Sequence, residues 1–350
     1  MPRDFLCGVV EGFYGRTWAD GARRAWAGWL RQLGLNAYLY CPKADPYLRR
    51  RWPEHWPEDQ WQALRSLSAW YAGQGLHFGV GLSPFELYRH YGRTERIRLR
   101  DKALRLAELE APLLAVLFDD MPGAVADLAE RQAEIVIDLA GWLPSARLLV
   151  CPTYYSTDPV LARHFGAMPG RYWQDLGAQL PPAVDTFWTG SRVCAEHIGR
   201  DELREMSAAF GRPLTLWDNY PVNDGAVRSR RLYLEPLPGR EPGLGSELAG
   251  HFCNPMNQSW LSLPALRGLS RLHGRGEPPA TWEGEVLGEL LWRLLQRDGP
   301  GFREPGLDAL DGRRREALAR EYAALPGPAA AEVAGWLRGE YTFDPACLTD

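Results

Sequence analysis

Short apolar segments, most of which end in a polar or aromatic cluster, recur about eight times along the chain. They lie at residues 8–10, 37–40, 78–82, 113–118, 148–151, 186–188, 214–217 and 251–253. A short apolar run bounded by Gly or Pro is typical of a buried strand in a parallel sheet. Stretches with helical spacing separate most of these runs, and about eight strand–helix units indicate a (β/α)8 barrel. We therefore predict an α/β fold, a (β/α)8 TIM barrel.

Three of the stretches between the apolar segments carry apolar residues at spacings of three and four, as one face of a helix requires. These stretches are 22–33, 59–71 and 124–143. In the first of them, Trp26, Trp29, Leu30 and Leu33 form the apolar stripe. We interpret such stripes as faces that pack on the barrel rather than as ligand sites.

The region after the last apolar segment contains the final barrel helix and a helical appendage. A helix is expected over 264–273, followed by a break rich in Gly and Pro at 274–279. Beyond this break, helical patterns cover 285–295, 313–324 and 329–337. We predict a barrel domain at 1–275 and a small C-terminal helical region at 276–350, which either packs on the barrel or forms the surface of a homodimer.

Charge and hydropathy exclude several classes of protein. The formal net charge of −4 provides no basic surface for nucleic acid, although short Arg runs occur at 49–51 and 313–315. The chain has no run of roughly 18 apolar residues, the length that a membrane span needs. The first apolar run, 5–10, is too short for a signal peptide and fits a first strand. We therefore predict a cytoplasmic protein without nucleic-acid or membrane partners.

The cysteine and histidine patterns favour neither disulfides nor a metal site. The six cysteines contain no closely spaced pair, and a reduced thiol on a strand behaves as a small apolar group. Four of them fall on or beside expected strands: Cys7, Cys41, Cys151 and Cys253. The seven histidines lack the spacings of zinc sites, and no glycine-rich phosphate loop occurs. We expect no metal and no cofactor, so the chemistry must come from carboxylates, amides, tyrosines and a lysine.

The apolar segment 113–118 stops abruptly at two adjacent carboxylates, Asp119 and Asp120. The two acids could simply be solvated or could cap the next helix. In a barrel, however, the carboxyl ends of the strands are where catalytic residues lie. Neighbouring residues of a strand point to opposite faces, so both acids reach one ligand only if the chain has already left strand geometry. They then fit best as neighbours with different tasks, one donating a proton to a leaving oxygen and the other holding the substrate group that attacks.

The other expected strand ends carry groups that suit a carbohydrate. Asp, Asn and Lys form paired hydrogen bonds with sugar hydroxyls, and Trp or Tyr covers the apolar face of the ring. The candidates at the barrel mouth, besides the two acids, are Lys43, Tyr154, Tyr155, Trp188, Trp217, Asp218, Asn219, Asn223, Asp224 and Asn254. The sequence thus favours a sugar-binding pocket at this end of the barrel.

Several of these motifs, taken in order, resemble glycoside hydrolase family 84. The motifs are Gly8-Val9-Val10-Glu11-Gly12-Phe13-Tyr14-Gly15-Arg16, Tyr38-Leu39-Tyr40-Cys41-Pro42-Lys43, Phe118-Asp119-Asp120, Trp188-Thr189-Gly190, Trp217-Asp218-Asn219 with Asn223-Asp224, and Asn254-Pro255. The resemblance runs in order through residues 5–270. That family contains protein O-GlcNAcases and bacterial β-N-acetylglucosaminidases once called hyaluronidases. The resemblance implies exo-acting, retaining hydrolysis of terminal β-linked GlcNAc, in which the 2-acetamido oxygen attacks its own anomeric carbon to give an oxazoline.

The resemblance also implies a role for each matching residue. Asp119 would orient the acetamido N–H, and Asp120 would be the general acid and then the base. Tyr155 would hydrogen-bond the acetamido group, and Trp217 would wall the pocket for its methyl. The sugar ring would be bound by Gly12, Lys43, Asn219, Asp224 and Asn254, with Tyr154, Trp188 and Val193 at the pocket edge. The partner would be a GlcNAc-containing glycoconjugate or an O-GlcNAc-modified protein.

Other interpretations stay open at this stage. Gly12 could serve only a turn, Lys43 could form a surface ion pair, and Asp218 could cap a helix or turn. At the level of the whole protein, Asp119 and Asp120 could be ligands of a metal-dependent sugar-modifying enzyme. A non-catalytic GlcNAc-binding barrel would keep the same pocket. The first strand begins almost at Met1 and the helical region is short, which leaves the leaving group open between a protein, a glycosaminoglycan and a cell-wall sugar.

Overall fold

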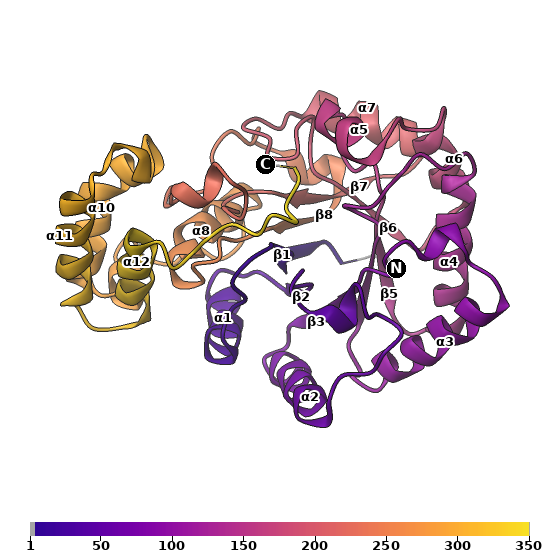
Figure 1. Ribbon diagram of the computed structural model, residues 1–350, viewed down its shortest axis with the longest axis horizontal. Helices are drawn as coiled ribbons and strands as arrows, with labels where there is room; N and C mark the ends of the chain where they lie inside the picture. The colour runs from indigo at the N-terminus through magenta and orange to yellow at the C-terminus, as the bar shows by residue number, and fades with distance from the viewer. Residues whose placement is uncertain (1–3, 350) are drawn as a thin grey trace.

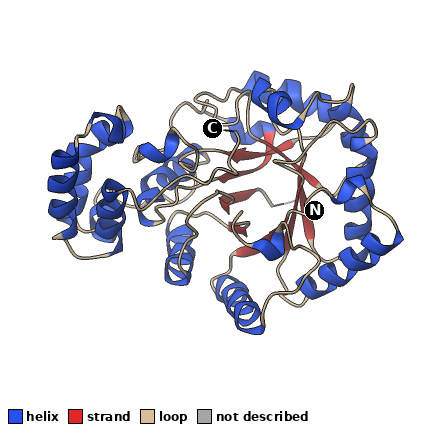
Figure 2. Ribbon diagram, in the orientation of Figure 1, coloured by secondary structure: helices blue, strands red, loops and turns tan. Residues whose placement is uncertain are grey.

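The computed structural model describes residues 4–349, and these residues form a closed barrel of eight parallel strands surrounded by helices (Figure 1, Figure 2). The strands are β1 (Leu6–Glu11), β2 (Ala37–Tyr40), β3 (His77–Leu82), β4 (Leu113–Leu117), β5 (Arg147–Cys151), β6 (Asp185–Trp188), β7 (Leu214–Asp218) and β8 (Leu248–Cys253). Each strand pairs in parallel with the next, and β8 closes the barrel on β1. The predicted (β/α)8 barrel is confirmed, with one strand at each apolar segment.

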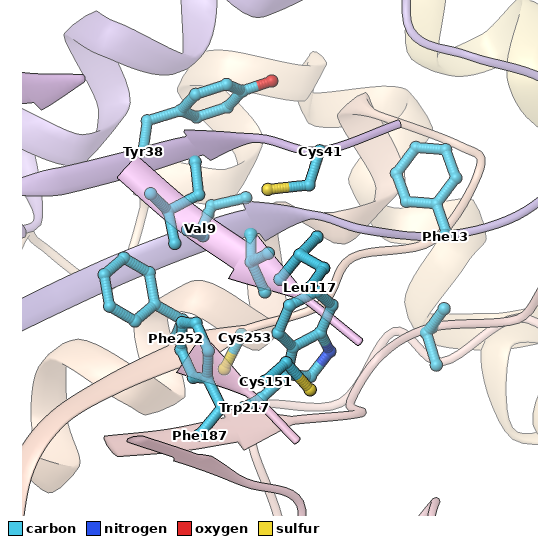
Figure 3. Packing of buried hydrophobic residues seen from close by; sticks show 14 of the residues in the cluster. Val9, Phe13, Tyr38, Cys41, Leu117, Cys151, Phe187, Trp217, Phe252 and Cys253 are labelled. Carbon is cyan, nitrogen blue, oxygen red and sulfur yellow. The ribbon is translucent and has the colours of Figure 1, made fainter. Parts of the chain in front are cut away.

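The barrel core is filled by apolar side chains that come from several strands. Val9, Leu117, Phe187 and Phe252 are buried there (Figure 3). The ring of Phe187 packs edge-on against Phe252, with centroids 5.9 Å apart, and against Trp217, with centroids 5.2 Å apart. Aromatic rings prefer this edge-to-face geometry. The core therefore holds Trp217, which lies at the carboxyl end of the barrel, in a fixed position.

The helices that follow the strands form the outer layer (Figure 1). They are α1 (Asp20–Gln32), α2 (Glu58–Gly73), α3 (Arg93–Ala107), α4 (Leu128–Trp142), α5 (Pro159–Phe165), α6 (Tyr172–Gln179), α7 (Arg200–Phe210) and α8 (Leu263–Leu272). The predicted stripe of α1 is correct, since Trp26, Trp29, Leu30 and Leu33 are all buried. On α2, Ala69, an apolar residue of the predicted stretch 59–71, is exposed, whereas Ser68 is buried and its Oγ donates to the backbone oxygen of Leu109.

Two predicted helices differ from the structure. The helix expected at 124–143 begins only at Leu128, because the preceding residues form the loop that carries the acids out of β4. The pattern at 285–295 is split into α9 (Trp282–Leu287) and α10 (Glu289–Arg303). Gly288, between them, has a φ of 101°, a backbone conformation that glycine adopts freely and other residues rarely do. The remaining two helices, α11 (Gly312–Ala323) and α12 (Pro328–Arg338), lie where the sequence predicts them.

The helical region contacts the barrel directly. Half-buried Glu332 of α12 accepts hydrogen bonds from Ser259 Oγ at 2.7 Å, from the backbone N–H of Trp260 at 2.9 Å and from that of Leu261 at 3.1 Å. Trp336 Nε1 donates to the backbone oxygen of Ser229 at 3.0 Å. Because α8 completes the barrel and α9 follows it, we propose the domain boundary at 275/276. A homodimer surface on the outer side of these helices remains a prediction.

Among the helices of residues 4–349, none has the length and apolar character needed to cross a membrane.

Candidate active site

The backbone turns sharply where β4 ends, and this turn brings both acids to one side. β4 stops at Leu117, and Asp120 adopts a φ of +53°, in the left-handed region that non-glycine residues rarely occupy. Such strain is found where the surrounding structure fixes a functional geometry. The chain has thus left strand geometry before the second acid, as a shared ligand requires, and Asp119 and Asp120 line the same pocket.

This pocket lies at the carboxyl ends of the strands, where barrel enzymes carry their chemistry. All nine residues assigned to the site from the sequence line it: Gly12, Lys43, Asp119, Asp120, Tyr155, Trp217, Asn219, Asp224 and Asn254. They follow six different strands, β1, β2, β4, β5, β7 and β8, or lie at their ends. Closure of the barrel therefore brings together residues that are up to 242 positions apart in the chain, such as Gly12 and Asn254.

Lys43 and Asp119 form a buried ion pair at the centre of the pocket. Lys43 Nζ donates to Asp119 Oδ2 and lies 3.9 Å from Asp120 Oδ2. Although burial opposes it, the negative charges of Asp119 and Asp120 raise the pKa of Lys43 above its usual value, so the ammonium stays charged. The alternative of a surface ion pair for Lys43 is wrong. The second oxygen of Asp119, Oδ1, is buried without a hydrogen-bond partner among residues 4–349.

Asp120 is held by donors on each oxygen. Tyr14 Oη donates to Asp120 Oδ2 at 2.7 Å, and Tyr155 Oη donates to Asp120 Oδ1 at 3.0 Å. Burial and the charge of Asp120 raise the pKa of both phenols well above the usual value, so both remain donors at neutral pH. Arg49 Nη2 donates to the backbone oxygen of Asp120 at 2.9 Å, and Arg49 Nη1 donates to Ser83 Oγ at 2.7 Å. The side chain and the strained backbone of Asp120 are therefore both fixed.

Sequence reasoning gave no role to Tyr14 or Arg49. Tyr14 lies in the cluster that follows β1, and this position predicts that it lies near the barrel mouth. The position does not predict its hydrogen bond to Asp120. Arg49 lies in the basic run 49–51, which the sequence suggests is only a solvated face. It is in fact buried against Asp120, and nothing in the sequence pattern indicates this.

A hydrogen-bond chain fixes the aromatic wall of the pocket. Asn219 Oδ1 accepts from Trp217 Nε1 and from Asn254 Nδ2, both at 3.0 Å. Asn254 Oδ1 in turn accepts from the backbone N–H of Gly12 at 3.2 Å. Asn219 Nδ2 donates to the backbone oxygen of Val193 at 2.8 Å. The three side chains thus hold one another in a single arrangement, with the Trp217 ring as a flat surface in the pocket.

Asp224 is a second kind of acid in this pocket. Its Oδ2 accepts the backbone N–H of Tyr14 at 2.8 Å. Burial raises the pKa of Asp224 to about 6, because the charged form loses its hydration. Asp224 is therefore a carboxylate at neutral pH and takes up a proton in mild acid.

Of the pocket-edge candidates, only Val193 lines the pocket. Tyr154 Oη donates to the backbone oxygen of Gly166 at 2.7 Å, and fully buried Trp188 directs its Nε1 toward Glu202 Oε1 at 3.3 Å. Asn223 also has a structural role, since its Nδ2 donates to Gln258 Oε1 at 2.9 Å. These residues support the walls of the site and do not face its interior.

Asp218 neither caps a helix nor faces the pocket. Arg240 donates to both of its carboxylate oxygens, and His251 Nε2 lies 3.1 Å from Asp218 Oδ2. The charge of Arg240, opposed by burial, lowers the pKa of Asp218 to about 2. This buried network fixes the end of β7 directly beneath Trp217 and Asn219.

Two groups of side chains within residues 4–349 could be considered as metal sites, and neither fits one. Asp218, His251 and Cys253 place potential ligand atoms within 4.8 Å of one another, a group that the sequence spacing does not reveal. However, Arg240 already occupies both oxygens of Asp218, so a cation there would have to displace a guanidinium. Beside Asp119 and Asp120, the ammonium of Lys43 takes the position that a metal ion would need.

Comparison with known proteins identifies the family of this chain. The sequence model of the family described as beta-N-acetylglucosaminidase matches residues 7–277. The chain belongs to this family of glycoside hydrolases. This confirms the resemblance to β-N-acetylglucosaminidases and O-GlcNAcases that the ordered motifs indicate.

The relatives include proteins from animals and bacteria. Proteins named protein O-GlcNAcase from Rattus norvegicus and Mus musculus are 29% identical over 265 residues and 30% identical over 262 residues. Each match covers 72% of this chain but only 28% of the relative, so the chain spans much less than the full length of these proteins. A solved structure of an O-GlcNAc hydrolase mutant from Thermobaculum terrenum is 27% identical, with a TM-score of 0.76, and the match covers 95% of this chain and 81% of that one.

Proposed function

We propose that this chain is an exo-acting, retaining β-N-acetylglucosaminidase that hydrolyses terminal β-linked GlcNAc through substrate-assisted catalysis. The proposal is carried by one observation, the buried and unpartnered Oδ1 of Asp119 in the pocket that also holds Asp120. A buried carboxylate oxygen without a donor is costly, and an amide N–H of the ligand would satisfy it. The 2-acetamido group of GlcNAc supplies such an N–H beside the anomeric carbon.

In the first step the acetamido oxygen attacks the anomeric carbon while the bond to the leaving oxygen breaks. Asp119 accepts the acetamido N–H and stabilises the positive charge that develops on that group. Asp120, in its protonated form, gives its proton to the leaving oxygen. The products are the free alcohol and a sugar oxazoline that is still protonated on nitrogen and keeps its N–H hydrogen-bonded to Asp119. Asp120 becomes a carboxylate, which Tyr14 and Tyr155 stabilise through their hydroxyl groups.

In the second step Asp120 acts as a base. Its carboxylate takes a proton from a water molecule as the water oxygen attacks the anomeric carbon, which opens the oxazoline and restores the acetamido group. Two inversions at one carbon give net retention. Lys43, which stays charged between the acids, would moderate their repulsion throughout the cycle.

The remaining residues would select the sugar. Trp217 presents its ring to the acetamido methyl, and Asn219 and Asn254 are held with fixed polarity for ring hydroxyls. Asp224 would accept hydrogen bonds from the hydroxyls far from the reacting bond. We propose that the enzyme acts on an O-GlcNAc-modified protein or another GlcNAc glycoconjugate, and the names of its relatives support this substrate class. We also propose that it is cytoplasmic.

The decisive experiment is release of 4-nitrophenol from its β-GlcNAc glycoside, compared with the β-glucoside and repeated with EDTA. Turnover of the N-acetyl substrate alone, unaffected by EDTA, is the expected result. Activity lost with EDTA would indicate a metal-dependent enzyme instead. Binding of GlcNAc without turnover would indicate a non-catalytic sugar-binding barrel.

Gly12→Ala should lower kcat/KM strongly without unfolding the protein. A Cβ at Gly12 would lie 2.2 Å from Trp217 Cζ2, so the indole ring would have to move and break its bond to Asn219. A misplacement of about 1 Å near the reacting centre can cost about 100-fold in rate. The control is Gly21→Ala, because a Cβ there meets nothing within 4 Å. Equal activity of the two variants would leave Gly12 with a turn role only.

The acid side of the pH profile should depend on Asp224. As the pH falls through about 6, Asp224 becomes protonated and loses its capacity to accept from sugar hydroxyls as a carboxylate. Below that pH, kcat/KM should therefore decrease as the proton concentration increases. Asp224→Asn should abolish this limb and lower the neutral plateau by roughly 10- to 100-fold, the effect of losing charged hydrogen bonds. Asp201→Asn, at an exposed acid of α7, controls for the lost charge. An acid limb that survives in Asp224→Asn would belong to another group.

A further inference from the structure

Residues 341–349 leave α12 and run back over the barrel mouth, as the yellow trace in Figure 1 shows. Near its start, Tyr341 packs against the guanidinium of Arg16, with the Arg16 Cζ 5.0 Å from the ring centroid. A turn follows, in which Asp344 Oδ1 accepts the N–H of Ala346 and the backbone oxygen of Asp344 accepts that of Cys347, both at 2.9 Å. The segment ends at Thr349, which is buried.

This segment reaches the catalytic groups. Cys347 and Thr349 line the sugar pocket. Thr349 Oγ1 lies 3.5 Å from the Tyr155 hydroxyl, the same phenol that donates to Asp120. Three more of its residues, Asp344, Ala346 and Leu348, line a groove that shares Tyr14, Lys43 and Asp120 with the sugar pocket. The segment therefore lies on the side where a leaving group would meet the general acid.

With the segment in place, the pocket is too small for its ligand. The sugar pocket encloses about 50 Å³, whereas the adjoining groove has about 520 Å³. Sites for small molecules usually enclose about 300 to 1,000 Å³. Cys347 and Thr349 line this small pocket, so they take up part of the space that a GlcNAc unit and its leaving group would need.

The contacts of the segment suit reversible release. Phe343 is 43% exposed and Leu348 is 47% exposed, so its two large apolar side chains bury little surface. The 3.5 Å distance between Thr349 Oγ1 and the Tyr155 hydroxyl oxygen is at the outer limit for a hydrogen bond. Segments with few buried apolar contacts open at a small cost in free energy.

We propose that residues 341–349 form a displaceable cover that occupies the leaving-group side of the sugar pocket and competes with the GlcNAc glycoside for it. This inference rests on the proposed function for the identity of the ligand. With this kind of competition, the apparent KM equals the KM of the uncovered protein divided by the fraction of molecules in which the cover is released. The value of kcat is unchanged. A permanent wall of the site would behave in the opposite way, because its removal would weaken binding.

Truncation after Phe343 tests the proposal, since it keeps the Tyr341 contact with Arg16 and removes the residues that line the site. If the cover is in place for nine molecules in ten, KM for the 4-nitrophenyl β-GlcNAc glycoside should fall about tenfold while kcat stays within about twofold. A synthetic peptide of residues 341–349 should then inhibit the truncated chain competitively, and a scrambled peptide should not. Thr349→Asp gives a second route in the full chain, because its carboxylate would be repelled by Asp120 and KM should also fall.

Calorimetric binding of free GlcNAc to the three proteins separates this proposal from the catalytic one. Tighter binding to both altered proteins supports the cover even if no form turns over a glycoside, in which case only the proposed function fails. Equal or weaker binding by both, with KM unchanged or raised, overturns the cover and makes the segment a wall. Absence of GlcNAc binding to every form overturns both proposals.

Discussion

Asp120→Asn should lower kcat/KM for β-GlcNAc glycosides with poor leaving groups by about 10² to 10⁴, the usual contribution of a general acid. An alkyl glycoside needs a proton on its leaving oxygen as the bond breaks, and Asn has none to give. A strongly acidic phenol leaves as its anion and needs no proton. Hydrolysis of a glycoside with such a leaving group should therefore be slowed much less. The measurement is kcat/KM over a series of leaving groups of rising pKa, because in the proposed mechanism this parameter reports the step that forms the oxazoline.

The surroundings of Asp120 make Asn a clean replacement. Asn keeps an oxygen that can accept from Tyr14 or Tyr155 and preserves the backbone contact with Arg49, so the pocket should keep its shape. Asn also tolerates the left-handed backbone at this position. An equal loss for all leaving groups would mean that Asp120 does not donate the proton.

Barrel topology explains why so much of the site could be predicted. A short apolar run marks a strand, and closure of a parallel barrel brings all carboxyl strand ends to one rim. Residues just past the ends of β2, β4 and β8, such as Lys43, Asp119 and Asn254, therefore meet in one pocket without any further information. The sequence alone was sufficient for this because the argument needs strand positions and not loop conformations.

The residues that were assigned wrongly or not at all depend on details that the pattern does not contain. Asp218 and Asn219 are adjacent polar residues, yet Asp218 is still in β7 and faces away from the pocket, toward Arg240. That arginine comes from the irregular stretch after Pro236, for which the sequence predicts no conformation. The contact of Thr349 with Tyr155 spans 194 residues and joins a segment without strand or helix pattern to the site, so only the folded chain reveals it.

Asp119→Asn should damage every N-acetyl substrate, whatever its leaving group. In the proposed mechanism, acetamido assistance is needed each time a glycoside reacts, and an amide cannot stabilise the charge that develops on the acetamido group as a carboxylate does. We expect kcat/KM to fall by about 10² to 10³, the usual cost of removing one such electrostatic contact, or about 2.7–4 kcal/mol. The loss should be the same for an alkyl and an activated phenyl glycoside, in contrast to Asp120→Asn.

Two controls separate this effect from the loss of the ion pair with Lys43. The β-glucoside has no acetamido group and should not be turned over, so it should give the same uncatalysed background with the parent and with Asp119→Asn. Fluorination of the acetyl methyl makes the attacking oxygen a weaker nucleophile, so the rate of the parent should fall steeply with each added fluorine. The variant has lost the stabilising carboxylate, so the dependence of its rate on the number of fluorines should differ from that of the parent. Because Asp119 Oδ1 is buried and has no hydrogen-bond partner among residues 4–349, it is the atom on which we expect the proposed assistance to depend. Unimpaired turnover of GlcNAc glycosides by Asp119→Asn would refute the assisted mechanism and leave that oxygen without a chemical role.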